Sequence, residues 1–172
     1  MRLLMVCLGN ICRSPLAEGA VRARLDAAGL DWVHVDSAGT GGWHAGEPPD
    51  RRSIAIAAQA GVDIRHQRAR KLLTDDYHAF DWLLCADLSV LRDVRARAPA
   101  DGAARAALLL DWAKTGSDAP GPGAEVPDPY TGGPRDFAEV CAMVDAAAAR
   151  IVARIAAGDA ADGAEAALSG RG

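Results

Sequence analysis

A cysteine and an arginine lie six residues apart near the start of the chain, at Cys7 and Arg13. The thiolate is the nucleophilic form of cysteine, and nearby hydrogen-bond donors or cations favour that form. The planar guanidinium of an arginine can bind two phosphate oxygens at once. The pair therefore indicates a cysteine nucleophile beside an oxyanion site. The alternative for Cys7 is a small core residue at the end of a buried strand, and the spacing alone does not decide between the two.

The residues around this pair predict a loop that presents backbone amides to an anion. Residues 3–6 are apolar and predict a buried strand, and a helical pattern begins at Leu16. The first turn of a helix leaves unpaired N–H groups and a partial positive charge, which suits a phosphate. Gly9 and Asn10 tolerate the positive φ angles that such a curled loop requires. We therefore expect a strand, an anion-binding loop and a helix, in this order.

Ser14 is expected to have two roles in this loop. It is predicted to be the N-cap of the helix, with Pro15 at the first helical position, where no N–H is needed. Its hydroxyl is also close enough in sequence to donate a hydrogen bond to the Cys7 sulfur. Such a bond would stabilise the sulfur as a leaving group.

A second group of residues could supply an acid. Asp128 lies between Pro127 and Pro129 and is followed by Tyr130. Cleavage of a phosphate ester expels a poor leaving group unless an acid protonates it. The flanking prolines would hold the aspartate rigidly, and the tyrosine could form one wall of an aromatic slot. A plain turn is the alternative, because Asp-Pro is a common turn pair.

Strands and helices alternate along the chain, which predicts a parallel α/β sheet with helices on both faces. Sites in such folds lie at the carboxyl ends of the strands, so we expect Cys7, Ser37 and Asp87 to lie near one another. Strands are predicted at residues 3–6, 33–35, 80–85 and 106–110. Helices are predicted at residues 16–28, 52–60, 72–77, 88–97 and 137–155, with a long loop at residues 111–134.

The composition bounds the class of protein. The 172 residues predict one domain over residues 1–157 and a disordered tail over residues 158–172. A net charge of −4 argues against a nucleic-acid partner. Residues 1–6 are too short for a signal peptide or a membrane span, which predicts a cytoplasmic protein with no membrane partner. The four cysteines contain no Cys-x2-Cys pair and the histidines are scattered, so no metal is expected.

The stretch from Cys7 to Pro15, Cys-Leu-Gly-Asn-Ile-Cys-Arg-Ser-Pro, resembles the active-site signature of the low-molecular-weight protein tyrosine phosphatases. The resemblance extends over residues 2–155. It implies a three-layer α/β/α fold of the phosphatase I-like type, with a four-stranded parallel sheet in the order 2-1-3-4. It implies a phosphoric monoester hydrolase that needs no cofactor, with Asp128 as the general acid. It also implies that the substrate phosphate is bound by the loop, at Leu8, Gly9, Asn10, Ile11, Cys12 and Ser14.

The resemblance also implies walls and supports for the pocket. Residues 37–40 and 43–46 resemble the loop that borders the family's pocket, with Trp43 as an aromatic wall opposite Tyr130. Residues 66–70 resemble the segment whose histidine joins an Asn–Ser–His network. Here that network would be Asn10, Ser37 and His66, holding the loop in its conformation. Thr131 replaces a second aromatic residue found in many members, so one wall would be thinner.

The implied reaction has two steps. Cys7 attacks phosphorus and Asp128 protonates the departing phenol, and Asp128 then activates the water that hydrolyses the phosphocysteine. The implied partner is a phosphotyrosine-containing protein, with a bacterial tyrosine kinase as one candidate, and inorganic phosphate is the product. The protein is expected to act as a monomer. Cys12 is placed to form a reversible disulfide with Cys7, which would protect the nucleophile from over-oxidation.

Three other readings of the loop are open. An arsenate reductase of this fold would use Cys7 and Arg13 but needs relay cysteines, and only Cys85 stands where one relay could stand. A protein-arginine phosphatase of the same family typically has threonine where Ile11 stands, and Ile11 favours an aromatic substrate. A non-enzymatic nucleotide-binding domain would need a Walker loop, which the sequence lacks.

Overall fold

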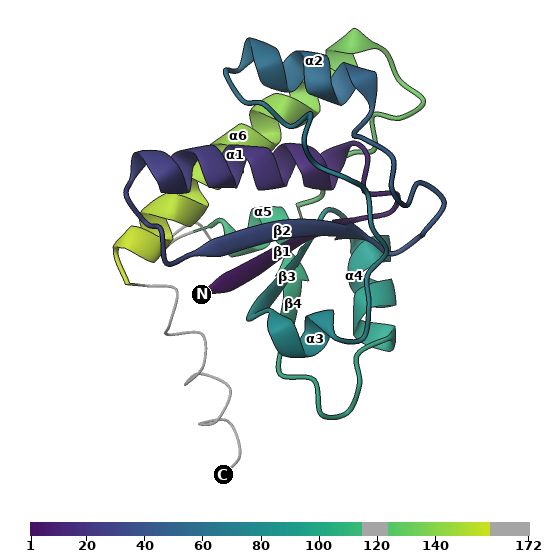
Figure 1. Cartoon of the computed structure of the whole chain (residues 1–172), viewed down its shortest axis with the longest axis vertical. Coiled ribbons are helices and arrows are strands. Elements are labelled where there is room, and N and C mark those ends of the chain that lie inside the picture. The colour runs from purple at the N-terminus through teal and green to yellow at the C-terminus, as the bar shows by residue number, and fades with distance from the viewer. Residues whose placement is uncertain (115–123, 159–172) are drawn as a thin grey trace.

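The computed structural model describes residues 1–114 and 124–158 and has a four-stranded parallel sheet at its centre (Figure 1). The strands are β1 (Arg2–Cys7), β2 (His34–Gly39), β3 (Trp82–Cys85) and β4 (Arg105–Leu108). Their order is β2-β1-β3-β4, as predicted, and every pairing is parallel. Because β1 lies inside the sheet, the loop that follows Cys7 opens at the middle of its carboxyl edge.

Helices cover both faces of the sheet and complete three layers (Figure 1). One face carries α1 (Arg13–Ala27), α2 (Arg51–Gln59), α5 (Leu109–Trp112) and α6 (Pro134–Ala156), and the other carries α3 (Asp76–Ala79) and α4 (Leu88–Ala96). Alternate residues of β1 enter the two cores: Leu3 and Met5 pack under α1 and α6, whereas Leu4 and Val6 pack toward α4. This double burial explains why β1 is apolar throughout.

Helix α1 begins earlier than the sequence pattern predicts. It starts at Arg13 rather than Leu16, and Cys12 occupies the N-cap position without a side-chain cap. The prediction that Ser14 caps the helix is therefore wrong, because Ser14 is already the second helical residue. Its hydroxyl is used by Cys7 and Asn10 instead. The Cys7–Pro15 signature thus runs directly into the first turn of α1.

Two segments between strands also differ from the predictions. The helix predicted at residues 72–77 is the shorter α3 at Asp76–Ala79, because Leu72 is drawn into the core and its N–H bonds to the carbonyl of Gly39 at 2.7 Å. The fourth strand, predicted to end at residue 110, ends at Leu108. The short helix α5 follows it and extends into the predicted loop, where Trp112 is buried. The predicted tail lies outside the described residues from residue 159 onward. Among the helices of the described ranges, none is long and apolar enough to span a membrane.

Candidate functional site

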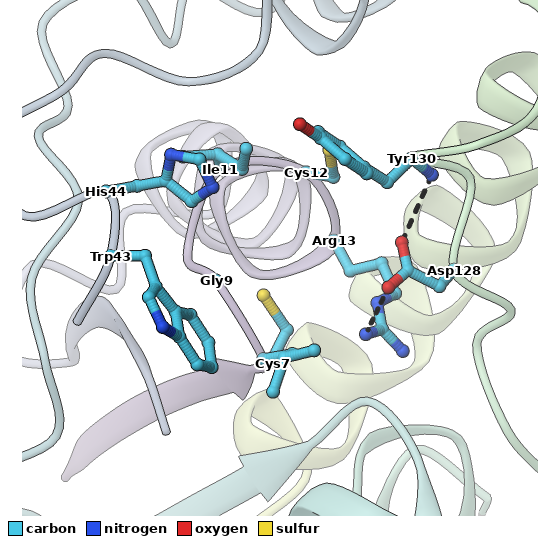
Figure 2. A pocket seen from close by; sticks show the side chains of 10 residues that line it. Cys7, Gly9, Ile11, Cys12, Arg13, Trp43, His44, Asp128 and Tyr130 are labelled. Carbon is cyan, nitrogen blue, oxygen red and sulfur yellow. Dashed lines mark hydrogen bonds and ion pairs between the residues drawn. The ribbon is translucent and has the colours of Figure 1, made fainter. Parts of the chain in front are cut away.

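A pocket of about 140 Å³ opens at the carboxyl end of β1 (Figure 2). Its floor is the loop after Cys7, and its sides come from the loop after β2 and from the segment before α6. The pocket is lined by Cys7, Leu8, Gly9, Ile11, Cys12, Arg13, Trp43, His44, Asp128 and Tyr130. The fold therefore brings three distant stretches of the sequence around one thiol.

The Cys7 sulfur has two polar neighbours in the loop. The backbone N–H of Asn10 donates to Sγ at 3.3 Å, and the Ser14 hydroxyl lies 3.0 Å from it. Ser14 Oγ already accepts a hydrogen bond from Asn10 Nδ2 at 2.9 Å, so its own hydrogen is free to point at the sulfur. Both contacts stabilise negative charge on the sulfur. Ser14 thus lies where the sequence spacing placed it, against the thiol.

The loop backbone curls as expected, but within the loop only Asn10 has a positive φ angle. Asn10 has a φ of 56°, whereas Gly9 is not among the positive-φ residues, so the prediction for Gly9 is wrong. A Cβ at Gly9 would lie 3.3 Å from His44 Cδ2, so a larger residue would require His44 to shift slightly. Within the described part of the chain, the N–H groups of Gly9, Ile11, Cys12 and Arg13 have no hydrogen-bond acceptor. Such open amides form a nest for an anion.

The side chain of Asn10 fastens the loop to its surroundings. Its Nδ2 donates to Ser37 Oγ at 2.9 Å, and its Oδ1 accepts from the N–H of Arg70 at 2.8 Å. Ser37 in turn donates its single hydroxyl hydrogen to Glu18 Oε2 at 2.7 Å. The third member of the network is therefore Glu18, and the prediction of His66 is wrong because its side chain is exposed. Burial raises the pKa of the Glu18 carboxyl above its ordinary value.

Arg13 is 4% exposed and is held by three groups. Its Nη1 donates to Asp87 Oδ2 at 2.5 Å and to the carbonyl of Val126 at 3.1 Å, and its Nη2 donates to Asp128 Oδ2 at 3.2 Å. The guanidinium is thereby fixed beside the pocket with Nη2 nearest the acid (Figure 2). Asp87 lies at the end of β3, where the sequence predicts it, but its contact with Arg13 has no signal in the sequence.

Asp128 lies at the mouth of the pocket and is half exposed. Its Oδ1 accepts a hydrogen bond from the N–H of Tyr130 at 3.1 Å, which is the turn that an Asp-Pro pair favours. The predicted turn is therefore present, and the acid role of Asp128 stays a prediction. One carboxylate oxygen fixes the turn, and the other faces Arg13.

Aromatic side chains form the upper walls of the pocket (Figure 2). Trp43 is 72% exposed and Tyr130 is 49% exposed, and they flank the thiol from two sides. His44 was not predicted as a site residue, yet its ring lies 6.5 Å from that of Tyr130, centroid to centroid. Its Nδ1 lies 2.8 Å from Glu47 Oε2, which orients the ring. Proximity to Trp43 in the sequence was the available signal.

The other cysteines differ in their access to the pocket. Cys12 lines it, and burial, followed by the negative charge of Asp50, raises the pKa of its thiol to about 12. Cys85 is buried in the core under α4 and does not line the pocket, which argues against a role as a relay cysteine in this conformation. Across the described residues, no group of three or more His, Cys, Asp or Glu side chains could hold a metal ion.

The sequence and the fold both match known phosphatases. The family described as low molecular weight phosphotyrosine protein phosphatase matches residues 2–160. A low molecular weight protein-tyrosine-phosphatase of Streptomyces coelicolor is 42% identical over 158 residues, which cover 90% of this chain and 93% of the relative.

Solved structures of similar fold are also phosphatases. A protein tyrosine phosphatase of Entamoeba histolytica has a TM-score of 0.81 at 29% identity and covers 92% of this chain and 99% of its own. A Drosophila arginine phosphatase, DARP, has a TM-score of 0.79 at 25% identity and covers 90% of this chain and 98% of its own. The likeness therefore includes two substrate chemistries.

Proposed function

Because the chain belongs to the low molecular weight phosphotyrosine protein phosphatase family, we propose that it hydrolyses phosphotyrosine through a cysteinyl-phosphate at Cys7. Its enzyme class is that of the protein-tyrosine-phosphatases, EC 3.1.3.48. The observation that carries the proposal is the Cys7 thiol between the open loop amides, with the Asp128 carboxylate at the same pocket.

In the first step the Cys7 thiolate attacks phosphorus in line with the ester oxygen. The loop amides and the Arg13 guanidinium bind the other phosphate oxygens and stabilise the charge that develops on them. Arg13 Nη2 leaves Asp128 for the phosphate, while Nη1 stays with Asp87. Protonated Asp128 then gives its proton to the departing phenol oxygen.

In the second step the phosphocysteine is hydrolysed. Asp128, now a carboxylate, takes a proton from a water molecule as that water attacks phosphorus, and the Cys7 sulfur leaves as a thiolate. The hydroxyl of Ser14 stabilises this leaving group, because it lies 3.0 Å from Sγ. Inorganic phosphate is the product, and the loop is returned to its starting state.

The walls support an aryl ester as substrate. Trp43 and Tyr130 offer faces for a phenyl ring, and Ile11 presents an apolar side chain within the pocket. The natural partner would be a phosphotyrosine-containing protein, and a bacterial tyrosine kinase is one candidate. The cytoplasmic location and the monomeric state stay predictions.

A protein-arginine phosphatase is the second candidate, and the likeness to DARP is the observation that favours it. Comparison of kcat/KM for a phosphotyrosine peptide and for a phosphoarginine peptide separates the two activities. We expect the phosphotyrosine peptide to be preferred. A preference for phosphoarginine would reverse the assignment.

The decisive experiment is hydrolysis of an aryl phosphate at mildly acidic pH with a chelator present. We expect Cys7→Ser and Arg13→Ala to abolish activity, and Asp128→Ala to lower kcat by about 10²- to 10³-fold, since general acids contribute factors of this size. Cys141→Ser, which changes a cysteine outside the pocket, should keep full activity. Activity that survives Cys7→Ser, or that requires added metal, would contradict the mechanism.

A further inference from the structure

Arg52 is bound to a carboxylate at the start of α2. Its Nε donates to Asp50 Oδ1 at 3.0 Å and its Nη2 to Oδ2 at 2.8 Å, so the two side chains meet fork to fork. Asp50 also caps the helix by accepting from the N–H of Arg52 at 2.8 Å. The backbone N–H of Asp50 donates to the carbonyl of Ile11 at 2.8 Å, which joins this pair to the phosphate-binding loop. The ion pair of Asp50 and Arg52 is therefore fixed to the loop that forms the floor of the pocket.

The same guanidinium reaches the segment that carries Asp128. Its Nη2 donates to the carbonyl of Tyr130 at 3.0 Å, and its Nη1 donates to the carbonyl of Gly132 at 3.2 Å. The guanidinium carbon lies 4.3 Å from the ring centroid of Phe137 and 5.8 Å from that of Tyr130. Hydrogen bonds occupy its edges and aromatic rings lie on its faces. Arg52 thus connects α2 to the residues just after the acid.

We propose that Arg52 is a positioning residue that holds Asp128 and Tyr130 over Cys7. It has no direct contact with the pocket space, and it acts through the backbone of Tyr130, whose N–H binds Asp128 Oδ1 at 3.1 Å. The N–H of Val126 binds the carbonyl of Ala86 at 2.8 Å and holds the segment before Asp128, whereas Arg52 holds the segment after it, at Tyr130 and Gly132. This inference rests on the proposed function, because it assigns Arg52 a role only if Asp128 is the acid.

Arginine is required at this position by its geometry. The two carbonyls and the two carboxylate oxygens need four donor contacts in one plane, and stacking on Phe137 needs a flat cation. A lysine has a single compact ammonium group and cannot make these contacts together. We therefore expect Arg52→Lys to behave more like Arg52→Gln than like the unchanged protein.

The test compares two aryl phosphates whose leaving groups differ in their need for an acid. Phenol resembles the tyrosine side chain, with a pKa of about 10, and needs protonation as it leaves. p-Nitrophenol is far more acidic than phenol, so its departure depends much less on protonation by an acid. Displacement of a catalytic group by about 1 Å costs roughly 10²-fold. The constant kcat/KM reports the first step, in which the phenol leaves, whereas the second step is the same for both esters. We therefore expect Arg52→Gln to lower kcat/KM for phenyl phosphate by about 10- to 100-fold and for p-nitrophenyl phosphate by clearly less.

A matched control lies one residue away. The Arg51 side chain is exposed and, within the described ranges, makes no hydrogen bond or ion pair. Arg51→Gln removes the same charge at the same helix start and should leave both rates unchanged. In an Asp128→Ala background, Arg52→Gln should lower the phenyl phosphate rate no further, because the group that it positions is gone.

The outcomes separate the two proposals. If Asp128→Ala slows phenyl phosphate more than p-nitrophenyl phosphate but Arg52→Gln matches Arg51→Gln, the positioning role is wrong and the proposed acid stands. If Asp128→Ala lowers kcat/KM equally for both esters, the proposed acid is wrong, and the role of Arg52 with it. If Arg52→Gln lowers both rates equally and the effects multiply with Asp128→Ala, the side chain is only structural. Thermal melting followed by circular dichroism shows whether each variant is folded at the assay temperature, so that a lower rate is not mistaken for a loss of folded protein.

Discussion

Trp43 is mostly exposed, yet its ring is supported by the backbone beneath it. A Cβ atom at Gly41 would lie 1.7 Å from Cζ3 of the indole, a distance at which the ring has to move. The glycine two residues before the tryptophan therefore sets the position of one pocket wall. This contact is a residue-scale requirement for the shape of the aryl slot.

We expect Gly41→Ala to displace Trp43 and to weaken binding of aryl phosphates. Loss of an aromatic contact of about 1 kcal/mol would raise KM about fivefold, with little effect on an alkyl phosphate that does not fill the slot. Gly42→Ala is the control, because its Cβ would meet only the flexible Lys71 side chain at 3.3 Å. Equal effects of the two variants on aryl phosphate KM would argue against this role of Gly41.

Cys12 should be a slow nucleophile despite its place in the pocket. Its pKa is raised to about 12 by burial and by Asp50, so at pH 9 only about one molecule in 10³ carries the thiolate. In a Cys7→Ser variant we expect iodoacetamide to modify Cys12 at least 100-fold more slowly than free cysteine at pH 9, with the rate rising toward pH 12. Mass spectrometry of the Cys12 peptide measures this. Rapid modification at pH 8 would contradict it.

The predicted disulfide between Cys7 and Cys12 depends on the same property. The Cys12 sulfur must attack an oxidised Cys7, and a thiol attacks mainly as its thiolate. Closure after mild peroxide treatment should therefore become faster as the pH rises. If no peptide that joins the two cysteines is recovered, the disulfide hypothesis is wrong.

At the scale of elements, the phosphate-binding loop is joined to β2 and α1 through one chain of hydrogen bonds. Asn10 in the loop binds Ser37 in β2, and Ser37 binds Glu18 in α1. The raised pKa of Glu18 means that the folded protein binds its proton more tightly than the unfolded chain does. The free energy of unfolding should therefore fall as the pH rises from the ordinary value of 4.5 through the raised folded value.

We expect Glu18→Gln to remove this pH dependence, because glutamine stays neutral and its carbonyl can still accept from Ser37. The variant should melt at or above the temperature of the unchanged protein at pH 7, and the difference should vanish below pH 4.5. Ser37→Ala is the contrast, because it leaves Asn10 and Glu18 without their shared partner and should cost about 1–3 kcal/mol. A melting temperature of Glu18→Gln well below that of the unchanged protein at pH 7 would contradict the argument.

The sequence predicts elements well where local patterns agree with tertiary contacts. The apolar run in β1 is a strong local signal, and α4 is capped by Asp87, which accepts from the N–H of Val90 at 2.8 Å; both elements lie close to where they are predicted. The start of α1 is three residues off, because the signature residues are polar and their helical turn is stabilised by the contacts of Ser14 and Arg13 rather than by periodicity.

The site shows the same division. The spacing of Cys7 and Arg13 and the residues around them indicate an oxyanion site, whereas the proposed acid role of Asp128 comes from the resemblance, since a plain turn also explains its motif. The side chains that contact these groups are distant from them in the sequence, so only the three-dimensional structure identifies them. No motif in the sequence points to Glu18, and His66 is implied only by the resemblance, yet the hydroxyl of Ser37 donates to Glu18.

At the scale of the whole molecule, the proposed catalytic groups lie apart from the residues that contribute most to stability. The pocket is at one edge of the sheet, whereas the larger core lies between the sheet, α1 and α6. Ile151 in α6 is fully buried in this core and does not line the pocket. Stability and activity should therefore respond to different substitutions.

We expect Ile151→Ala to lower the free energy of unfolding by about 2–5 kcal/mol, because it leaves a cavity where α6 packs on the core. Urea unfolding at 25 °C measures this, while kcat for an aryl phosphate at the same temperature should stay within about twofold, since misplacing a reacting group is what costs large factors. Ala142→Ser, at an exposed position of the same helix, is the control and should change stability by about 0.5 kcal/mol or less. A large fall in kcat for folded Ile151→Ala would mean that the packing of α6 sets the position of the segment that carries Asp128. Stability and activity would then depend on the same residues, which contradicts this prediction.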